Sequence, residues 1–123
     1  MTQALRHRQE RQRNRPDMIA RLWSARTTPA PSHSYLQHFE QAVQPQLQSV
    51  AGFLGATVYT RPVSATVEIL VTTYWHSLAS IEAFAGVDRE AAVVAAEAAA
   101  LLTDFDKRVR HYEVPIAEFP SAR

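Results

Sequence analysis

Three segments of the chain alternate in side-chain character with the two-residue period of a β-strand. They are residues 18–27, 53–61 and 66–75, and the last of them (TVEILVTTYW) is the clearest. A period of two places successive side chains on opposite faces of a sheet. Only residues 62–65 join the second segment to the third, and so short a link is typical of an antiparallel hairpin. The pattern therefore predicts three strands, two of them paired.

Apolar residues at spacings of three and four indicate a helix after the turn-rich residues 27–34. Ser34 is expected to cap its first turn, since a serine hydroxyl accepts hydrogen bonds from free backbone N–H groups. Pro45 lies inside the apolar stripe, where its missing N–H predicts a kink or a restart. Gly52 marks the exit from the helix. The stripe consists of Tyr35, Leu36, Phe39, Val43, Leu47 and Val50.

Two further helices and a fourth strand are predicted in the second half of the chain. Ser77 is expected to cap a helix that ends at Gly86. Asp88 is expected to cap an alanine-rich helix over residues 89–102, because alanine has the highest helix propensity. Residues 108–114 (RVRHYEV) alternate again and predict the last strand.

This order of elements predicts an α+β fold of the ferredoxin-like split βαβ type, with a four-stranded antiparallel sheet and helices on one face. The first and third strands nevertheless carry apolar side chains on both faces, and a large apolar face seldom stays exposed on a monomer. We therefore expect a homodimer with its sheets packed face to face. In the third strand one face holds Val67, Ile69, Val71 and Trp75, and the other holds Leu70 and Tyr74.

The composition is typical of an ordered globular domain. The 123 residues are 46% apolar and 20% charged, with a net charge of +1. Cysteine is absent, which excludes disulfide scaffolds, thiolate metal sites and thiol nucleophiles. No run approaches the ~18 apolar residues of a membrane span, and the N-terminus lacks the apolar core of a secretory signal. We therefore expect a cytoplasmic protein that does not contact membranes.

Charge is distributed unevenly along the chain. Residues 1–15 carry a net charge of +4, whereas residues 16–123 carry −3. We expect residues 1–17 to form a disordered basic tail, residues 18–114 the folded domain, and residues 115–123 a short C-terminal tail. Nucleic-acid binding through the basic tail is disfavoured, because the folded part of the chain is acidic.

Several residue strings occur together along the predicted domain. They include Tyr74-Trp75-His76-Ser77, Phe84-Ala85-Gly86 and His111-Tyr112-Glu113-Val114, together with Arg21, Trp23, Tyr35, His38, Pro45 and Gly52-Phe53 in the first half. In this combination the chain resembles the antibiotic biosynthesis monooxygenase (ABM) superfamily from residue 18 to residue 114. The resemblance implies a dimeric α+β barrel. That superfamily includes quinone-forming monooxygenases, which use O₂ without a metal or flavin, and haem-degrading monooxygenases.

The haem-degrading branch fits this chain poorly. That branch uses an asparagine on the first strand, a tryptophan at the end of the third strand and a haem-ligating histidine on the second helical segment. Trp75 matches, but the only asparagine is Asn14, and no histidine lies between His76 and His111. Histidine and carboxylate spacings predict no metal site, and three glycines cannot build a phosphate-binding loop. We therefore expect no cofactor.

The quinone-forming branch implies a pocket that binds an aromatic ring and deprotonates a phenol. Imidazole suits the base because it titrates near neutral pH, and Arg21 suits a carboxylate or phenolate because its guanidinium binds such groups bidentately. The candidate catalytic groups are Trp75 as an aromatic wall and His38, His76 or His111 as the base. The candidate substrate contacts are Arg21, Trp23, Tyr74 and Tyr112.

Each candidate also has a purely structural explanation. Trp75 at a strand end would serve core packing, and His38 would occupy a solvated helix position. His111 would pair with an acid on a neighbouring strand, and Arg21 would form an ion pair with Glu68 across the sheet.

Two functions follow from these alternatives. The first is a cofactor-independent monooxygenase that oxidises an aromatic or polycyclic small molecule. The second is a non-catalytic dimeric barrel, of the stress-response type, that binds a hydrophobic small molecule. A shared fold does not decide between them, because one fold can support many activities.

Overall fold

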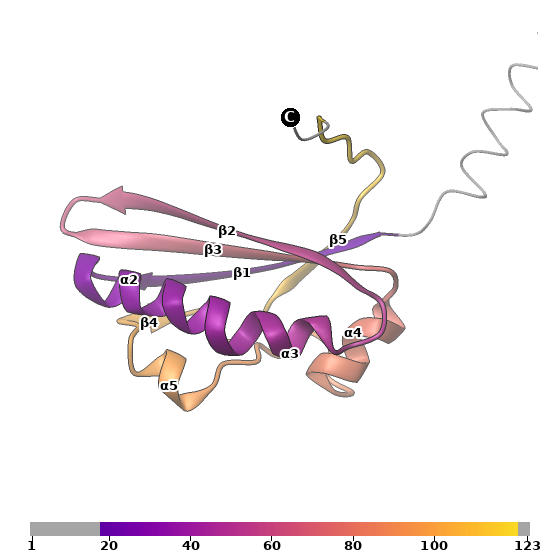
Figure 1. The fold of residues 1–123 in the computed structure, drawn as a ribbon, viewed down its shortest axis with the longest axis horizontal. Coiled ribbons are helices and arrows are strands. Elements are labelled where there is room, and N and C mark those ends of the chain that lie inside the picture. Colours follow the sequence, from indigo (N-terminus) through magenta and orange to yellow (C-terminus); the bar gives the residue numbers. More distant parts are fainter. Residues whose placement is uncertain (1–17, 121–123) are drawn as a thin grey trace, which may run out of the picture.

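The computed structural model describes residues 18–120 and contains one antiparallel sheet with helices against it (Figure 1). The expected basic tail, residues 1–17, lies outside the described residues, as do the last three residues of the expected C-terminal tail. The elements are β1 (Ile19–Thr27), α2 (Pro29–His38), the π-helical segment η1 (Phe39–Val43), α3 (Gln44–Gln48), β2 (Phe53–Val63), β3 (Thr66–Trp75), α4 (Leu78–Ala85), α5 (Ala96–Ala99), β4 (Asp104–Phe105) and β5 (Arg110–Glu113).

The three long strands form the body of the sheet. Their order is β2-β3-β1, and both pairings are antiparallel, with one register shift near the start of β2. The remaining edge of β1 is shared by two short strands: β5 pairs with its first half and β4 with its second half. The ferredoxin-like α+β prediction is therefore confirmed, and the predicted fourth strand is present as β5. The pattern did not predict β4, which is only two residues long.

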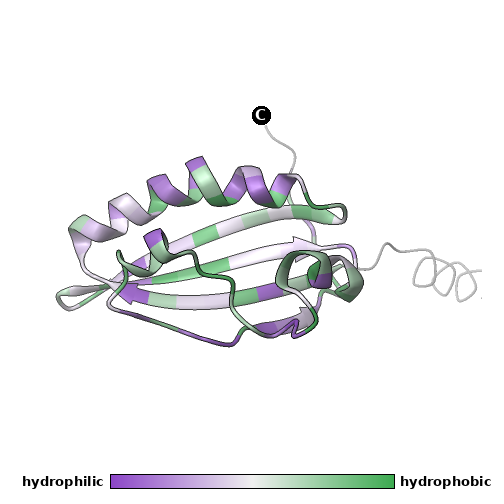
Figure 2. Cartoon of the chain, turned by 90° about the horizontal axis from the view of Figure 1, so that it is seen from below, coloured by the Kyte–Doolittle hydropathy of each residue, from purple (hydrophilic) through white to green (hydrophobic). Residues whose placement is uncertain are grey.

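The helices lie on one face of the sheet, as Figure 1 shows from the side and Figure 2 from the helical side. We call this the covered face; its core includes Trp75, Leu47, Ile69 and Ile81, all fully buried. We call the opposite face the open face, because no helix of the described residues covers it. The strand registers place Leu22, Tyr59, Leu70, Tyr74 and Tyr112 on the open face.

The predicted hairpin is present, and its link is shorter than expected. Val63 pairs with Thr66, so Ser64 and Ala65 form the turn, and Ser64 has a positive φ of 55°. Two-residue hairpin turns require such left-handed conformations, because they match the twist of the strands. Pro62 remains in β2, which is an edge strand and tolerates a residue without a backbone donor.

The first helix begins earlier than the sequence predicts. It starts at Pro29, whose fixed φ suits the first helical position, and Thr28 precedes it without a side-chain cap bond. The expectation that Ser34 caps this helix is therefore wrong, since Ser34 lies inside α2. The predicted restart at Pro45 is confirmed: the helix widens to the π form in η1 and resumes as α3, with the proline in its first turn.

The short helix α4 follows its local sequence signals. The Ser77 hydroxyl accepts a hydrogen bond from the backbone N–H of Ser80 at 3.1 Å, as expected of an N-cap. Gly86 ends the helix with a φ of 92°, a value that side-chain-bearing residues rarely adopt.

The predicted helix over residues 89–102 is wrong, because only α5 within it is α-helical. The backbone before α5 is bonded to the strand region instead: Ala92 N–H donates to Lys107 O at 3.0 Å, and Val109 N–H donates to Glu90 O at 2.8 Å. These long-range bonds outweigh the modest helix propensity of alanine. Asp88 is not a helix cap either, and it forms an ion pair with Arg108 at 2.8 Å.

Candidate functional site

A cavity of about 70 Å³ lies between the covered face and the helices. Its walls include Arg21 and Trp23 from β1, Tyr35 and His38 from α2, and Phe84 from α4. Residues 93–95, in the irregular segment before α5, also line it. The remaining lining residues are Phe39, Val43, Leu47, Val71, Thr73, Ala98 and Val109. Small-molecule sites usually enclose roughly 300–1,000 Å³. The cavity in this conformation therefore holds only a small part of an aromatic ligand.

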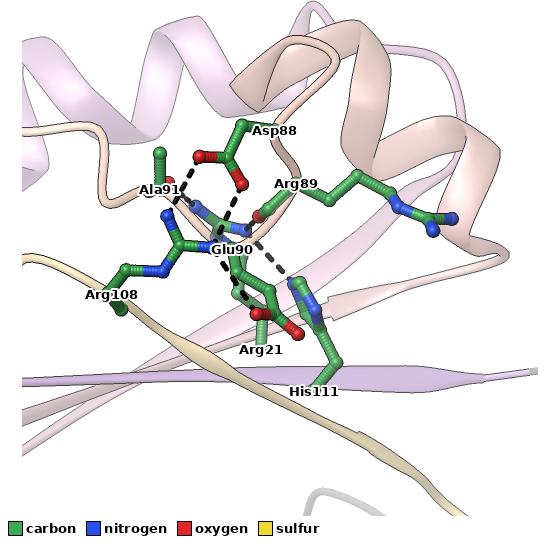
Figure 3. A network of polar contacts seen from close by, with 7 residues as sticks. All are labelled: Arg21, Asp88, Arg89, Glu90, Ala91, Arg108 and His111. Carbon is green, nitrogen blue, oxygen red and sulfur yellow. Dashed lines mark hydrogen bonds and ion pairs between the residues drawn. The ribbon is translucent and has the colours of Figure 1, made fainter.

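Arg21 is the charged residue of the cavity. The alternation of β1 points it to the covered face, where it is only 5% exposed. Its guanidinium donates Nη1–H to Arg89 O and Nη2–H to Ala91 O, the latter at 2.7 Å (Figure 3). The guanidinium carbon lies 5.8 Å from the centre of the Phe84 ring, within the range of a cation–π contact. Arg21 thus anchors residues 89–91, which lead to residues 93–95, and we call residues 93–95 the roof of the cavity.

The charge of Arg21 has no acidic partner among residues 18–120. Desolvation by burial lowers its pKa to about 10, so the guanidinium remains protonated at neutral pH. The predicted ion pair with Glu68 is absent from the structure, because Arg21 faces the helices and Glu68 lies on the open face. The Glu68 carboxylate instead accepts a hydrogen bond from Arg61 at 2.9 Å.

His111 lies on β5 and contacts Arg21. The distance between its Nε2 and Arg21 Nη1 is 3.0 Å (Figure 3). An arginine can only donate, so Nε2 must accept, which requires a neutral imidazole at this contact. Burial, and then the positive charge of Arg21, lowers the pKa of His111 below its usual value and favours that neutral form.

His38 and Tyr35 bring polar atoms into the predominantly apolar helical wall. Within the described residues the Nε2 atom of His38 is buried and has no hydrogen-bond partner. The ring of Tyr35 lies 6.4 Å from that of His38, and burial raises the pKa of Tyr35 to about 12. The Tyr35 hydroxyl is therefore a neutral hydrogen-bonding group on the residue next to an imidazole whose Nε2 lacks a partner within the described residues.

Of the two tryptophans, Trp23 is part of the cavity wall and Trp75 is part of the core. Trp23 lines the cavity, and its indole N–H donates to Asp106 O at 2.8 Å. Trp75 is fully buried in the core, where its indole N–H donates to the Thr73 hydroxyl at 2.8 Å. Thr73 lines the cavity, whereas Trp75 packs behind it against Phe84 at a ring distance of 5.6 Å.

The other predicted site residues lie elsewhere. Tyr74 and Tyr112 project from the open face, and His76 is exposed in the turn after β3. The structure therefore brings together Arg21, Trp23 and His38 around the cavity and joins His111 to them through Arg21.

Sequence reasoning missed four contributors to the site. Tyr35 and Phe84 entered through the family resemblance, and Tyr35 also through an apolar helical stripe, but neither signal shows that they border a cavity. The carbonyls of Arg89 and Ala91 were assigned to a helix, where they would bond within the helix. The only available signal was Arg21 itself, a charged residue that shares a strand face with Ile19 and Trp23.

The described residues contain neither a cluster of metal ligands nor a helix that could span a membrane. In the part of the chain from 18 to 120, no three histidine, aspartate or glutamate side chains gather in a way that could hold a metal ion. Across the same residues, no helix combines the length and apolar character needed to cross a bilayer.

One sequence family and two of the solved structures similar to this chain share one description. The sequence model of antibiotic biosynthesis monooxygenases matches residues 18–96. A Bacillus cereus structure provisionally given that name is 15% identical, with a TM-score of 0.56, and the match covers 85% of this chain and 99% of that chain. A Chloroflexus aurantiacus J-10-fl structure with the same provisional name is 19% identical, with a TM-score of 0.53 and coverages of 85% and 97%.

A third solved structure is a Streptomyces coelicolor monooxygenase in complex with nanaomycin D. It is 22% identical to this chain, with a TM-score of 0.53, and the match covers 87% of this chain and 95% of that chain. At such low identities these three structures show a common fold. No curated protein sequence matches the chain.

Proposed function

Because the chain belongs to the antibiotic biosynthesis monooxygenase family, we propose that it is a monooxygenase that oxidises an aromatic small molecule in the cavity on the covered face. The observation that carries the proposal is the buried Nε2 of His38, a cavity residue whose imidazole nitrogen has no partner within residues 18–120. Buried polar atoms are nearly always hydrogen-bonded. A phenolic ligand in the cavity supplies the missing partner.

The proposed first step is proton transfer. The phenol O–H bond breaks, its proton moves to His38 Nε2, and its electron pair delocalises into the ring. Arg21, with its buried positive charge, stabilises negative charge in the cavity. Trp23, Tyr35 and Phe84 provide the aromatic surface that holds the ring.

The electron-rich ring then reduces O₂. The phenol becomes a quinone: the substrate gives up four electrons, the phenolic proton and the one hydrogen of the ring carbon opposite the phenolic oxygen, and that carbon receives one oxygen atom, while the second oxygen atom leaves as water with the two hydrogens. The substrate supplies all four electrons that O₂ needs, so this stoichiometry requires no external reductant. In this proposal the protein contributes binding, orientation and deprotonation.

Ligand entry in this proposal requires the cavity to widen. The roof before α5 is irregular, and its residues Val93 and Ala95 are exposed on their outer side. Outward displacement of this roof enlarges the cavity without disturbing the sheet. The nanaomycin D complex of the Streptomyces coelicolor monooxygenase supports the proposal that this fold accommodates a polycyclic ligand.

We also propose that the active form is a homodimer. Tyr59 and Tyr112 are about half exposed on the open face, with Leu22, Leu70 and Tyr74 partly exposed beside them. A second copy packed against this face would bury that apolar surface. The cavity lies on the opposite side of the sheet, so the dimer contact leaves its walls intact.

The test of the proposed activity compares two histidine variants of α2. His38→Gln removes the proposed base, and His33→Gln is the matched control because His33 is exposed on the same helix. We expect His38→Gln to lower the initial rate of O₂ uptake with anthrone or 1-naphthol by about 10²–10⁴-fold, and His33→Gln to leave it unchanged. Oxygen-electrode measurements and product mass spectrometry provide the readouts.

A clear result distinguishes this function from the non-catalytic alternative. Saturable binding of these aromatics with no O₂ uptake above the protein-free rate would favour the binding barrel. Equal rates in wild type and His38→Gln would show that His38 is not the base.

A further inference from the structure

We infer that the ligand of the cavity is an aromatic acid, whose ionised carboxylate pairs with Arg21 while its ring occupies the apolar part of the cavity. The inference rests on the proposed function for the location of the binding site and for the widening of the cavity that admits a ring. It adds the charge of the ligand and the residue that selects it.

Arg21 differs from three other arginines of residues 18–120 because each of those has a carboxylate partner; Arg89 and Arg110 lack one as well, but both are more exposed than Arg21. Arg26, Arg61 and Arg108 are exposed or half-buried, and each forms an ion pair with a carboxylate at 2.8–2.9 Å. Arg21 is the most buried of these four and has no such partner within the described residues. A buried charge without a counter-charge is costly, whereas exposed charges are solvated by water.

The acids closest to Arg21 along the network are engaged elsewhere. Asp88 and Glu90 both accept hydrogen bonds from Arg108, at 2.8 Å and 3.3 Å, on the exposed side of the segment (Figure 3). The partners of Arg21 itself are two peptide carbonyls and the neutral His111. These acceptors orient the guanidinium but do not neutralise it.

The guanidinium also retains donor capacity. An arginine has five N–H donors, and the hydrogen bonds of Arg21 to the described residues involve only Nη1 and Nη2. The Nε–H is therefore available, and Arg21 is part of the cavity wall. A carboxylate accepts such donors in short, charge-assisted hydrogen bonds.

The rest of the cavity determines the remainder of the ligand. Trp23, Tyr35 and Phe84 present ring surfaces, and Val71, Val94 and Ala98 add aliphatic surface. A flat hydrocarbon ring system with one ionised group therefore matches both parts of the site. A neutral aromatic of the same shape fills the apolar part and leaves the arginine unpaired.

The experiment measures the binding of two isosteric probes, 2-naphthoic acid and 2-naphthamide, to the full chain at pH 7 by isothermal titration calorimetry. We expect wild type to bind the acid at least tenfold more tightly than the amide. Arg21→Gln is expected to abolish that preference, and Arg21→Lys to retain part of it because the positive charge remains. Arg89→Gln is the matched control, since the Arg89 side chain extends away from the network (Figure 3).

Several outcomes would overturn the inference. They are equal affinities of wild type for the two probes, no binding of either probe at millimolar concentration, and the same loss of preference in Arg89→Gln. Arg21 also fastens the segment at residues 89–91, so circular dichroism and thermal melts must show that the variants fold. The wild-type comparison tests the inference even if Arg21→Gln does not fold.

The outcomes also separate this inference from the proposed activity. If the acid is preferred but phenolic naphthoic acids consume no O₂, the monooxygenase proposal fails and the anion site stands. If neutral phenols are oxidised while acid and amide bind equally, the anion site fails and the monooxygenase stands.

Discussion

The two faces of the sheet differ in the kind of side chain that is left without a matching partner: mainly apolar ones on the open face, and polar ones around the cavity on the covered face. The open face holds two ion pairs, Arg61 with Glu68 and Arg26 with Asp104, each at 2.9 Å, whereas Arg110 is exposed there and has no carboxylate partner within the described residues. The other side chains exposed there are largely apolar, and one buried polar atom, the hydroxyl oxygen of Thr57, has no hydrogen-bond partner within the described residues. On the covered face the apolar side chains are packed, and the unsatisfied groups are the charge of Arg21 and the Nε2 of His38.

This contrast indicates what each face is suited to bind. Unpaired polar groups around a small cavity favour a small polar or charged ligand, since only a ligand can enter and neutralise them. Exposed apolar side chains beside satisfied ion pairs favour another protein surface, which buries area without displacing those pairs. The covered face is therefore the expected ligand side and the open face the expected dimer side.

The largest effect is expected from removing the central aromatic residue of the covered face. Trp75→Ala leaves a cavity among Phe53, Phe84 and Ile81, and truncations of this size cost about 3–5 kcal/mol of unfolding free energy. Val87→Ala is the control, because Val87 is 91% exposed and such surface changes stay within about 0.5 kcal/mol. Denaturant unfolding at equal protein concentrations measures both.

Trp75→Phe tests whether this residue only packs or also takes part in catalysis. The smaller ring retains most of the packing but leaves the Thr73 hydroxyl without its indole donor. A packing role predicts a modest stability loss with O₂ uptake unchanged. A folded Trp75→Phe protein that no longer turns over would establish the catalytic role predicted from the sequence.

The site could be predicted only in part, because β1 and α4 follow from local sequence signals, whereas the position of residues 89–95 depends on long-range contacts. The strand positions of Arg21 and Trp23 follow from a two-residue period, and α4 follows from the Ser77 and Gly86 signals, all of which are local. Residues 89–95 are alanine-rich and favour a helix locally, yet their backbone bonds to residues 107–109 and to Arg21. No periodicity in the sequence encodes those long-range contacts.

The same limit applies to Trp75 and His38. Both were predicted to face a pocket, and only the packing of α2, α3 and α4 on the sheet determines which of them reaches it. Trp75 was assigned to the correct face of β3, but the alternation does not show that neighbouring rings separate it from the cavity. Strand faces are encoded locally, whereas cavity walls are not.

The second-largest effect is expected on dimer formation, from a charge placed on the open face. Leu70→Glu places a charge in the proposed dimer contact, where leaving a carboxylate unpaired costs at least about 2 kcal/mol, or roughly 30-fold in the dimer dissociation constant. Ala79→Glu is the matched control, since it adds the same charge to an exposed position of α4 on the other side of the sheet. Light scattering during size-exclusion chromatography measures the molar mass.

The expected result is a wild-type and Ala79→Glu mass of two chains and a lower average mass for Leu70→Glu. A wild-type protein with the mass of one chain at micromolar concentration would remove the homodimer proposal. The ligand-binding proposals for the covered face would be unaffected.

The smallest effect is expected from the titration of His111. Its pKa is lowered in the folded protein by burial and by Arg21, so the unfolded chain binds a proton more readily than the folded chain. The stabilising contribution of neutral His111 is therefore fully present above about pH 6.5, the ordinary histidine value, and is lost as the pH falls through the lower, folded-state pKa. Its size is about that of one hydrogen bond, 0.5–1.5 kcal/mol.

His111→Gln isolates this contribution, because glutamine keeps a neutral acceptor for Arg21 but does not titrate. We expect the variant to match wild type at pH 7.5 and to lose less stability than wild type on acidification to pH 5. Denaturant unfolding at each pH, with His33→Gln as the control for an exposed histidine, gives the two slopes. Equal slopes in wild type and His111→Gln would mean that the contact between His111 and Arg21 adds no measurable stability. The covered face would then hold its arginine through the two carbonyls of residues 89 and 91 alone.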